Sequence, residues 1–206
     1  TAEGTRLVVT DSDWSASPSE LTPAGGRLFF RVLDRRRATD LWVCDGTASG
    51  TRRLLQNFLP PYEQRSRDPD SSYSGLTALG DQLFFVAIDD EHGSELWASD
   101  GTPEGTGLVK DLRPGTDWSY PRELTALGER LLFKADDGVH GGEFWASDGT
   151  AEGTALVKDL WPGPEGSCLG HLRPVGDRLF FSADDGVRGL EIWASDGTAE
   201  GTVLVA

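Results

Sequence analysis

Short apolar runs alternate with glycine and aspartate along the whole chain. The runs are rich in Phe, Leu, Val and Trp, and turn-forming residues interrupt them about every eight to twelve residues. This spacing excludes long helices and indicates strands joined by tight turns. In the second of the units that the pattern defines, we predict strands over residues 76–79, 82–87, 95–100 and 106–111.

The pattern returns with a fixed period. Aligning the chain on tryptophan places Trp42, Trp97, Trp145 and Trp193 at one point of four units, with steps of 55, 48 and 48 residues. The unit is therefore 48 residues long, and one copy carries an insertion of seven. Periods of this size are typical of propellers and of helical arrays, and the strand pattern excludes the helical arrays.

The second strand of a unit is apolar on both faces. Leu83, Phe85 and Ala87 point one way while Phe84 and Val86 point the other, so both faces must be covered. A four-stranded antiparallel sheet covered on both faces by copies of itself is a propeller blade. We therefore predict an all-β fold, a β-propeller built from four repeats of about 48 residues with four antiparallel strands per blade.

The chain 1–206 is interpreted as a single repeat domain. Its predicted blades span about residues 21–57, 76–111, 124–159 and 172–206, and residues 1–10 supply an extra outer strand. The surplus is visible in the sequence TAEGT, which occurs at residues 1–5 and again at 198–202. We expect a chain cut from a longer array, in which a terminal strand either competes for the edge of the fourth blade or pairs with another molecule.

Glycine and aspartate have defined places in the predicted hairpins. Gly80 and Asp81, with counterparts at 128–129 and 176–177, form two-residue loops with Gly first, as a type II′ turn requires. In the recurring phrase DGTxxGT, Asp can accept hydrogen bonds from the backbone ahead of it and Gly can take a positive φ. Residues that recur in every unit are thus explained by the architecture.

Charge limits the partners of the chain. Nineteen Lys and Arg stand against 34 Asp and Glu, a formal net charge of −15. This charge repels phosphate backbones and anionic lipid surfaces, so we expect no nucleic-acid partner. No apolar run approaches the roughly 20 residues that span a bilayer, so we expect no membrane insertion. Cys44 and Cys168 have neither disulfide-framework nor metal-site spacing, and we expect two free thiols.

The recurring phrase resembles the signature of the bacterial ELWxxDGT repeat proteins. The signature is intact as ELWASDGT from Glu95, and EFWASDGT from Glu143 and EIWASDGT from Glu191 are near-identical copies. The first unit departs, with Asp40 for Glu and Cys44 for Ser. The resemblance covers essentially the whole chain. It implies tandem propeller-like arrays in secreted or surface proteins, hence an extracellular or cell-surface location, and it implies no reaction.

Two kinds of chemistry compete with a purely architectural interpretation. The aspartates of the DGT phrases could bind Ca²⁺ together with acidic pairs such as Asp136 and Asp137, but adjacent Asp-Asp-Gly lacks the alternating ligands of a calcium loop. We therefore expect turn residues and no cofactor. No GxSxG, HExxH or GxxxxGK occurs, so we expect no enzyme. A glycan-directed enzyme would need the unmatched residues of the insertion to converge with His171; these are Tyr62, Glu63, Asp68, Asp70 and Tyr73.

Tryptophans outside the blade core point to binding. Trp14, Trp118 and Trp161 all lie between predicted blades, and Asp13 and Asp117 precede the first two. An aromatic face beside carboxylates and hydroxyls suits stacking on a sugar or anchoring a protein. The competing interpretation is that each tryptophan covers its own blade.

The sequence therefore predicts a non-catalytic extracellular binding or scaffolding propeller whose ligand is a carbohydrate or a surface protein. The alternatives are a glycan-directed enzyme domain and a purely structural array.

Overall fold

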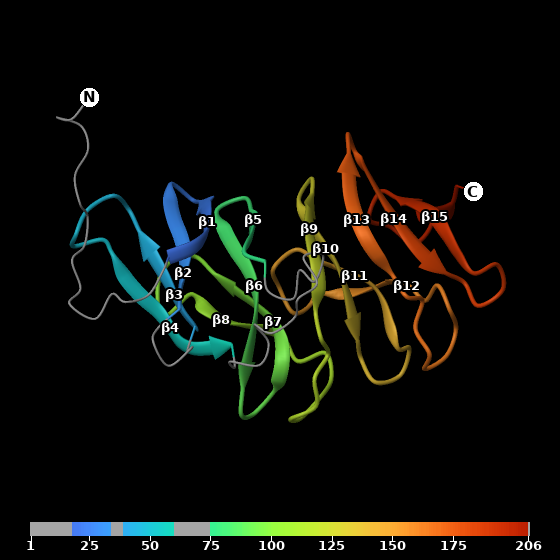
Figure 1. The fold of residues 1–206 in the computed structure, drawn as a ribbon, viewed down its shortest axis with the longest axis horizontal. Coiled ribbons are helices and arrows are strands. Elements are labelled where there is room, and N and C mark those ends of the chain that lie inside the picture. The colour runs from blue at the N-terminus through green and yellow to red at the C-terminus, as the bar shows by residue number, and fades with distance from the viewer. Residues whose placement is uncertain (1–17, 34–38, 60–74, 206) are drawn as a thin grey trace.

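The computed structural model describes residues 18–33, 39–59 and 75–205, which form four antiparallel sheets (Figure 1). The described residues contain strands, turns and loops, and no helix. Accordingly, no described helix is long and apolar enough to span a membrane.

Each sheet is one predicted blade and has its strands in sequence order. Blade 1 comprises β1 (Pro18–Ala24), β2 (Arg27–Leu33), β3 (Thr39–Cys44) and β4 (Arg52–Leu59). Blade 2 comprises β5 (Thr77–Leu79), β6 (Gln82–Asp89), β7 (Gly93–Ser99) and β8 (Thr106–Lys110). Blade 3 comprises β9 (Arg122–Leu127), β10 (Arg130–Asp136), β11 (Gly142–Ser147) and β12 (Ala155–Lys158). Blade 4 comprises β13 (Gly170–Val175), β14 (Arg178–Asp184), β15 (Leu190–Ser195) and β16 (Val203–Leu204).

The predicted all-β propeller architecture of four repeats is confirmed, with small differences at strand ends. In blade 2, β6 extends to Asp89 and β7 begins at Gly93, because these two residues pair directly across the hairpin. The carboxylate of Asp89 accepts hydrogen bonds from the backbone N–H groups of Glu91 and His92. These bonds tighten the turn, so the ladder continues two residues further than the apolar pattern predicts.

The first hairpin of each blade shows how local sequence sets the turn. In blade 2 Gly80 has a φ of +57° and Asp81 has no positive φ, as a type II′ turn requires. In blade 1 both Gly25 and Gly26 have positive φ, at +56° and +71°. Positive φ at both central residues is the type I′ pattern, so the Gly-Gly pair of blade 1 gives a different turn at the same place.

The core lies between successive blades and has the same composition at each interface. Phe29 and Leu41 of blade 1 pack with Phe85 of blade 2. The remaining two interfaces repeat this arrangement. Blade 2 contributes Phe84 and Leu96 to a cluster with Phe133 of blade 3, and blade 3 contributes Phe144 to a cluster with Phe181 and Trp193 of blade 4. In blades 2 and 3 the apolar residues on both faces of the second strand are thus used, one face for each neighbouring blade.

Polar contacts also join successive blades at their edges. Lys110 at the end of β8 donates a 2.7 Å hydrogen bond to the carbonyl of Thr154 in blade 3, and Lys158 makes the same bond to Thr202 in blade 4. Lys110 and Lys158 therefore each bind the DGTxxGT turn of the next blade.

The four blades follow one another along the longest axis, with blades 1 and 4 at opposite ends (Figure 1). We call the face of a blade that turns toward the next blade its leading face. On blade 3 the leading-face residue Phe144 is fully buried, whereas its counterpart on blade 4, Ile192, is 50% exposed. Val205, whose N–H donates to the carbonyl of Ile192, is also exposed. Strand β16 completes blade 4, so the C-terminal copy of the outer strand takes this edge.

Candidate functional site

The residues of the recurring phrase bind one another within its turn. In blade 2 the carboxylate of Asp100 accepts hydrogen bonds from the backbone N–H and the hydroxyl of Thr102, both at 2.7 Å. Thr102 in turn accepts from the backbone of Gly105, and the hydroxyls of Ser99 and Thr106 lie 2.7 Å apart. Gly101 has a φ of +87°. The side chains of the fourfold phrase therefore stabilise its own turn.

The carboxylates proposed as calcium ligands have turn roles among the described residues. The hydrogen bond from the Thr102 side chain, followed by that from its backbone, holds the pKa of Asp100 below its usual value. In the acidic pair of blade 3, Asp136 accepts from the N–H of Gly138, and Asp137 accepts from the N–H of Val139 and of His140. Each carboxylate thus stabilises its own loop. Binding of Ca²⁺ stays an untested alternative.

The glutamate that opens the phrase has a different environment. Glu95 and Glu143 are fully buried, and each accepts a hydrogen bond from the backbone 17 residues ahead, at Leu112 and Leu160 respectively. Burial raises the pKa of Glu95 to about 7, and burial also raises the pKa of Glu143. The pKa of a carboxyl group rises when its charged form is desolvated.

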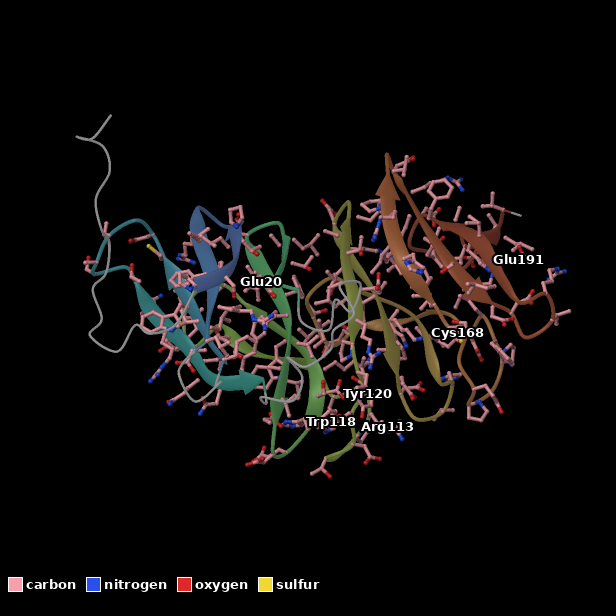
Figure 2. All side chains as sticks on the ribbon, viewed as in Figure 1. Glu20, Arg113, Trp118, Tyr120, Cys168 and Glu191 are labelled. Carbon is pink, nitrogen blue, oxygen red and sulfur yellow. The ribbon has the colours of Figure 1, made fainter. Side chains whose placement is uncertain are left out.

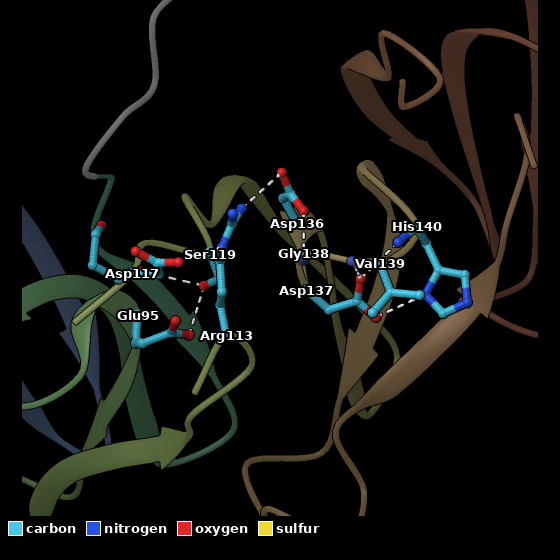
Figure 3. A network of polar contacts seen from close by, with 10 residues as sticks. Glu95, Arg113, Asp117, Ser119, Asp136, Asp137, Gly138, Val139 and His140 are labelled. Atoms are coloured by element: carbon cyan, nitrogen blue, oxygen red, sulfur yellow. Dashed lines mark hydrogen bonds and ion pairs between the residues drawn. The ribbon is translucent and has the colours of Figure 1, made fainter. Parts of the chain in front are cut away.

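The link between blades 2 and 3, residues 111–121, is built on this glutamate (Figure 3). The hydroxyl of Ser119 donates to Glu95 at 2.6 Å, and the carbonyl of Ser119 accepts from the N–H of Asp136 at 2.8 Å. Arg113 forms ion pairs with Asp117 at 3.5 Å and with Asp136 at 3.3 Å. The link is therefore fixed to the blade before it and to the blade after it.

The link presents two aromatic rings together (Figure 2). The rings of Trp118 and Tyr120 have centroids 5.3 Å apart, and Tyr120 is exposed while Trp118 is half-buried. Trp118 lies against Gly93, since a Cβ at Gly93 would be 2.6 Å from the Trp118 ring. The side chain of Asp117 is largely exposed. Trp118 therefore both covers its own blade and leaves part of its ring in solvent.

A pocket of about 200 Å³ opens beside these rings. The link supplies Ser119 and Tyr120 to its lining, and blade 3 supplies Arg122, Lys134, Asp136 and Gly142. Most of these positions depart from the repeat. At the matching positions, 48 residues further along the chain, blade 4 has Cys168 for Tyr120, Gly170 for Arg122 and Ser182 for Lys134.

The structure places the other predicted site residues elsewhere. Trp161 lies in the next link, where a Cβ at Gly186 of blade 4 would be 2.8 Å from its indole nitrogen, so Trp161 packs on the loop of the following blade. It does not contribute to the pocket. Trp14 and Asp13 lie outside the described residues, as do the predicted residues 62–73 of the insertion. His171 is exposed on β13.

Sequence reasoning missed Tyr120, Arg122 and Lys134. A signal was present, because all three break a pattern that the next unit otherwise repeats at an offset of 48. Tryptophan was given weight for its residue type alone, whereas the cations become noticeable only when the sheet places Arg122 directly opposite Lys134.

No family model matches the chain, and no curated protein matches it. Solved structures do match. A TolB protein from Agrobacterium tumefaciens is 13% identical, with a TM-score of 0.53 over 96% of this chain and 67% of that chain. A puromycin hydrolase is 15% identical, with a TM-score of 0.56 over 98% of this chain and 30% of that chain.

A puromycin-hydrolyzing peptidase from Mycobacterium tuberculosis is 14% identical, with a TM-score of 0.54 over 97% of this chain and 29% of that chain. The chain thus spans less than a third of the length of either peptidase. At these identities the likeness is one of fold, and it defines the class of the protein as an all-β, propeller-type fold.

Proposed function

We propose that this chain is a non-catalytic binding propeller of the ELWxxDGT repeat type, which acts outside the cell or at the cell surface and binds a carbohydrate at the link between blades 2 and 3. The observation that carries the proposal is the pair of Trp118 and Tyr120 beside the pocket of blade 3. Aromatic side chains with an exposed face suit stacking on a sugar ring, and the neighbouring carboxylate and hydroxyl suit its polar groups.

A purely structural array is the competing function, and the packing of Trp118 on Gly93 favours it. The two functions predict different effects of removing the Trp118 ring on ligand binding and on melting temperature. If Trp118 binds ligand, the W118A variant should lose binding by about tenfold or more with a modest fall in melting temperature. If the ring is structural, W118A should lose several degrees and no binding signal should change.

The test is a screen of the whole chain against bacterial polysaccharides and surface proteins, followed by thermal melts. The W161A variant is the matched control, since Trp161 is also half-buried in a link but lies away from the pocket. Equal loss of binding in W118A and W161A would contradict a site at the link between blades 2 and 3. A surface-protein ligand in place of a polysaccharide would leave the binding role standing and exclude the carbohydrate.

A further inference from the structure

Two cations lie opposite one another at the pocket of blade 3. Lys134 on β10 and Arg122 on β9 are direct cross-strand partners, and like charges in such a pair destabilise a sheet. The guanidinium of Arg122 lies over the Tyr120 ring, 5.5 Å from its centroid. Within the described part of the chain, no residue forms a hydrogen bond or an ion pair with the ammonium of Lys134. Burial lowers the pKa of Lys134, and the charge of Arg122 acts in the same direction, whereas Cys168, Glu143 and Asp136 act in the opposite direction.

The neighbouring residue leaves space for this lysine. A Cβ at Gly142 would lie 2.6 Å from Cε and 3.3 Å from Nζ of Lys134, so any larger residue would displace the side chain. The positions that match Gly142 hold Ser94 in blade 2 and Leu190 in blade 4. In both of these blades the residue that matches Lys134 is not a cation. Glycine and lysine therefore occur together in blade 3 alone among these three blades.

In blade 1 a carboxylate neutralises the cation at the position that corresponds to Lys134. Arg31, the counterpart of Lys134, is buried and forms an ion pair with the carboxylate of Glu20 at 2.6 Å. The counterpart of Glu20 in blade 3 is Glu123, and its carboxylate accepts a hydrogen bond from the backbone of Leu172 in blade 4. The other carboxylate of the pocket, Asp136, binds Arg113 and Gly138. The carboxylate that neutralises the cation in blade 1 thus has another role in blade 3.

We infer that the pocket lined by Lys134, Arg122 and Tyr120 binds the carboxylate of a uronate unit in a polysaccharide, an inference that rests on the proposed carbohydrate-binding function. An ammonium and a guanidinium side by side suit a carboxylate, with which each forms charge-assisted hydrogen bonds. The pocket is smaller than the roughly 300–1,000 Å³ of sites for drug-sized ligands, which suits one sugar unit. Because the chain carries a net charge of −15, a densely charged polyanion is repelled. The uronate unit therefore stands among neutral sugars.

Calorimetry on the whole chain tests this with two matched probes, an oligosaccharide with a single glucuronate unit and the same oligosaccharide with its carboxyl group reduced to the alcohol. We expect the acidic probe to bind about tenfold more tightly or better. The K134V variant, which has the residue found at the matching position of blade 2, should bind both probes equally. R188V removes a cation from an exposed loop of blade 4 and should keep the preference. K134V should melt no lower than the parent chain, because a like-charge pair is removed.

Equal binding of the two probes by the parent chain, or an unchanged preference in K134V, would overturn the inference. The proposed function would nevertheless stand if binding of the reduced probe is lost in the W118A variant. If neither probe binds, the inference fails, and the proposed function depends on the polysaccharide screen. Competition by oligoglutamate as strong as that by the acidic probe would also overturn the uronate assignment, since the site would then recognise acidic peptides.

Discussion

The hydroxyl of Ser119 donates a 2.6 Å hydrogen bond to the carboxylate of Glu95, 24 residues earlier in the chain. Ser167 lies at the same offset from Glu143 and acts to lower its pKa, and its hydroxyl donates to the carbonyl of Gly142 at 3.4 Å. The carbonyl of Ser119 accepts from the N–H of Asp136 in blade 3, and Ser167 repeats this bond one blade further on. In the two links that join blades 2, 3 and 4, a buried carboxylate therefore binds the link, and the link binds the next blade.

Stability should depend on pH through this carboxylate. Burial raises the pKa of Glu95 to about 7 from an ordinary value of 4.5. The folded state thus binds the proton more tightly than the unfolded state, so the contribution of Glu95 is fully present below pH 4.5 and is lost as the pH rises through 7. The loss is on the order of 3 kcal/mol. Urea unfolding of the E95Q variant should not show this fall.

The informative quantity is the difference between the parent chain and E95Q at each pH, because His92 and His140 cancel in it. The hydrogen bonds that the His92 and His140 rings donate to Asp89 and Asp137 raise the pKa of these histidines, so their stabilising contribution also falls as the pH rises above 6.5. E191Q is the matched control, since Glu191 opens the same phrase in blade 4 but is only half-buried. A parallel pH profile for E95Q and the parent would contradict the role of Glu95.

Alanine at Gly93 should be more damaging than alanine at Gly189. Both glycines end the same loop and have positive φ, at +68° and +82°, so each alanine variant pays about 1–2 kcal/mol for that conformation. A Cβ at Gly93 would also lie 2.4 Å from the carbonyl oxygen of Asp117, whereas nothing lies within 4 Å at Gly189. We expect G93A to lose a further 1 kcal/mol or more, roughly, in urea unfolding. Equal losses would mean that the link does not press on the loop.

Much of the fold could be predicted because the structure of each blade depends mainly on local sequence. Strand length, turn type and the two-faced apolar pattern of residues 82–87 depend on neighbours within a few positions. Contacts between residues far apart in the sequence have no such local signal. The hydrogen bonds that Glu95 accepts from Leu112 and Ser119 span 17 and 24 residues. Nothing in the phrase ELWASDGT distinguishes a buried carboxylate from an exposed one.

The candidate site was only partly predictable for the same reason. Trp118 and Asp117 were found because their residue types are unusual between blades. The pairing of Arg122 with Lys134 depends on the register of β9 against β10, which a bulge shifts between Leu132 and Lys134. A bulge moves side chains relative to the partner strand, so alternation along the sequence alone places these cations wrongly.

Replacing Cys44 by serine should be tolerated. Cys44 accepts hydrogen bonds from the N–H of Gly46 and the hydroxyl of Thr51, both at 3.1 Å, whereas Ser147 and Thr154 make the matching contact at 2.7 Å. Sulfur is a weak acceptor, so C44S should raise the free energy of unfolding by up to about 1 kcal/mol. A denaturing, non-reducing thiol count should fall from two to one. A loss of stability would show that burial of the sulfur outweighs the bonds.

The leading faces of blades 2 and 4 should respond differently to truncation. Leu96 of blade 2 is fully buried against blade 3, while its counterpart on blade 4, Ile192, is 50% exposed. We expect L96A to lower the free energy of unfolding by about 2–5 kcal/mol, because the cavity cannot collapse. I192A should cost less than about 1 kcal/mol, since most of the lost contact is with water.

Concentration provides the control for this comparison. Urea unfolding and light scattering of both variants and the parent would be repeated over a range of protein concentrations. If I192A costs as much as L96A and the cost grows with concentration, another molecule covers the leading face of blade 4 in solution. A small cost that is independent of concentration contradicts such self-association through this face. It would leave the neighbouring residues Ile192 and Val205 exposed to solvent.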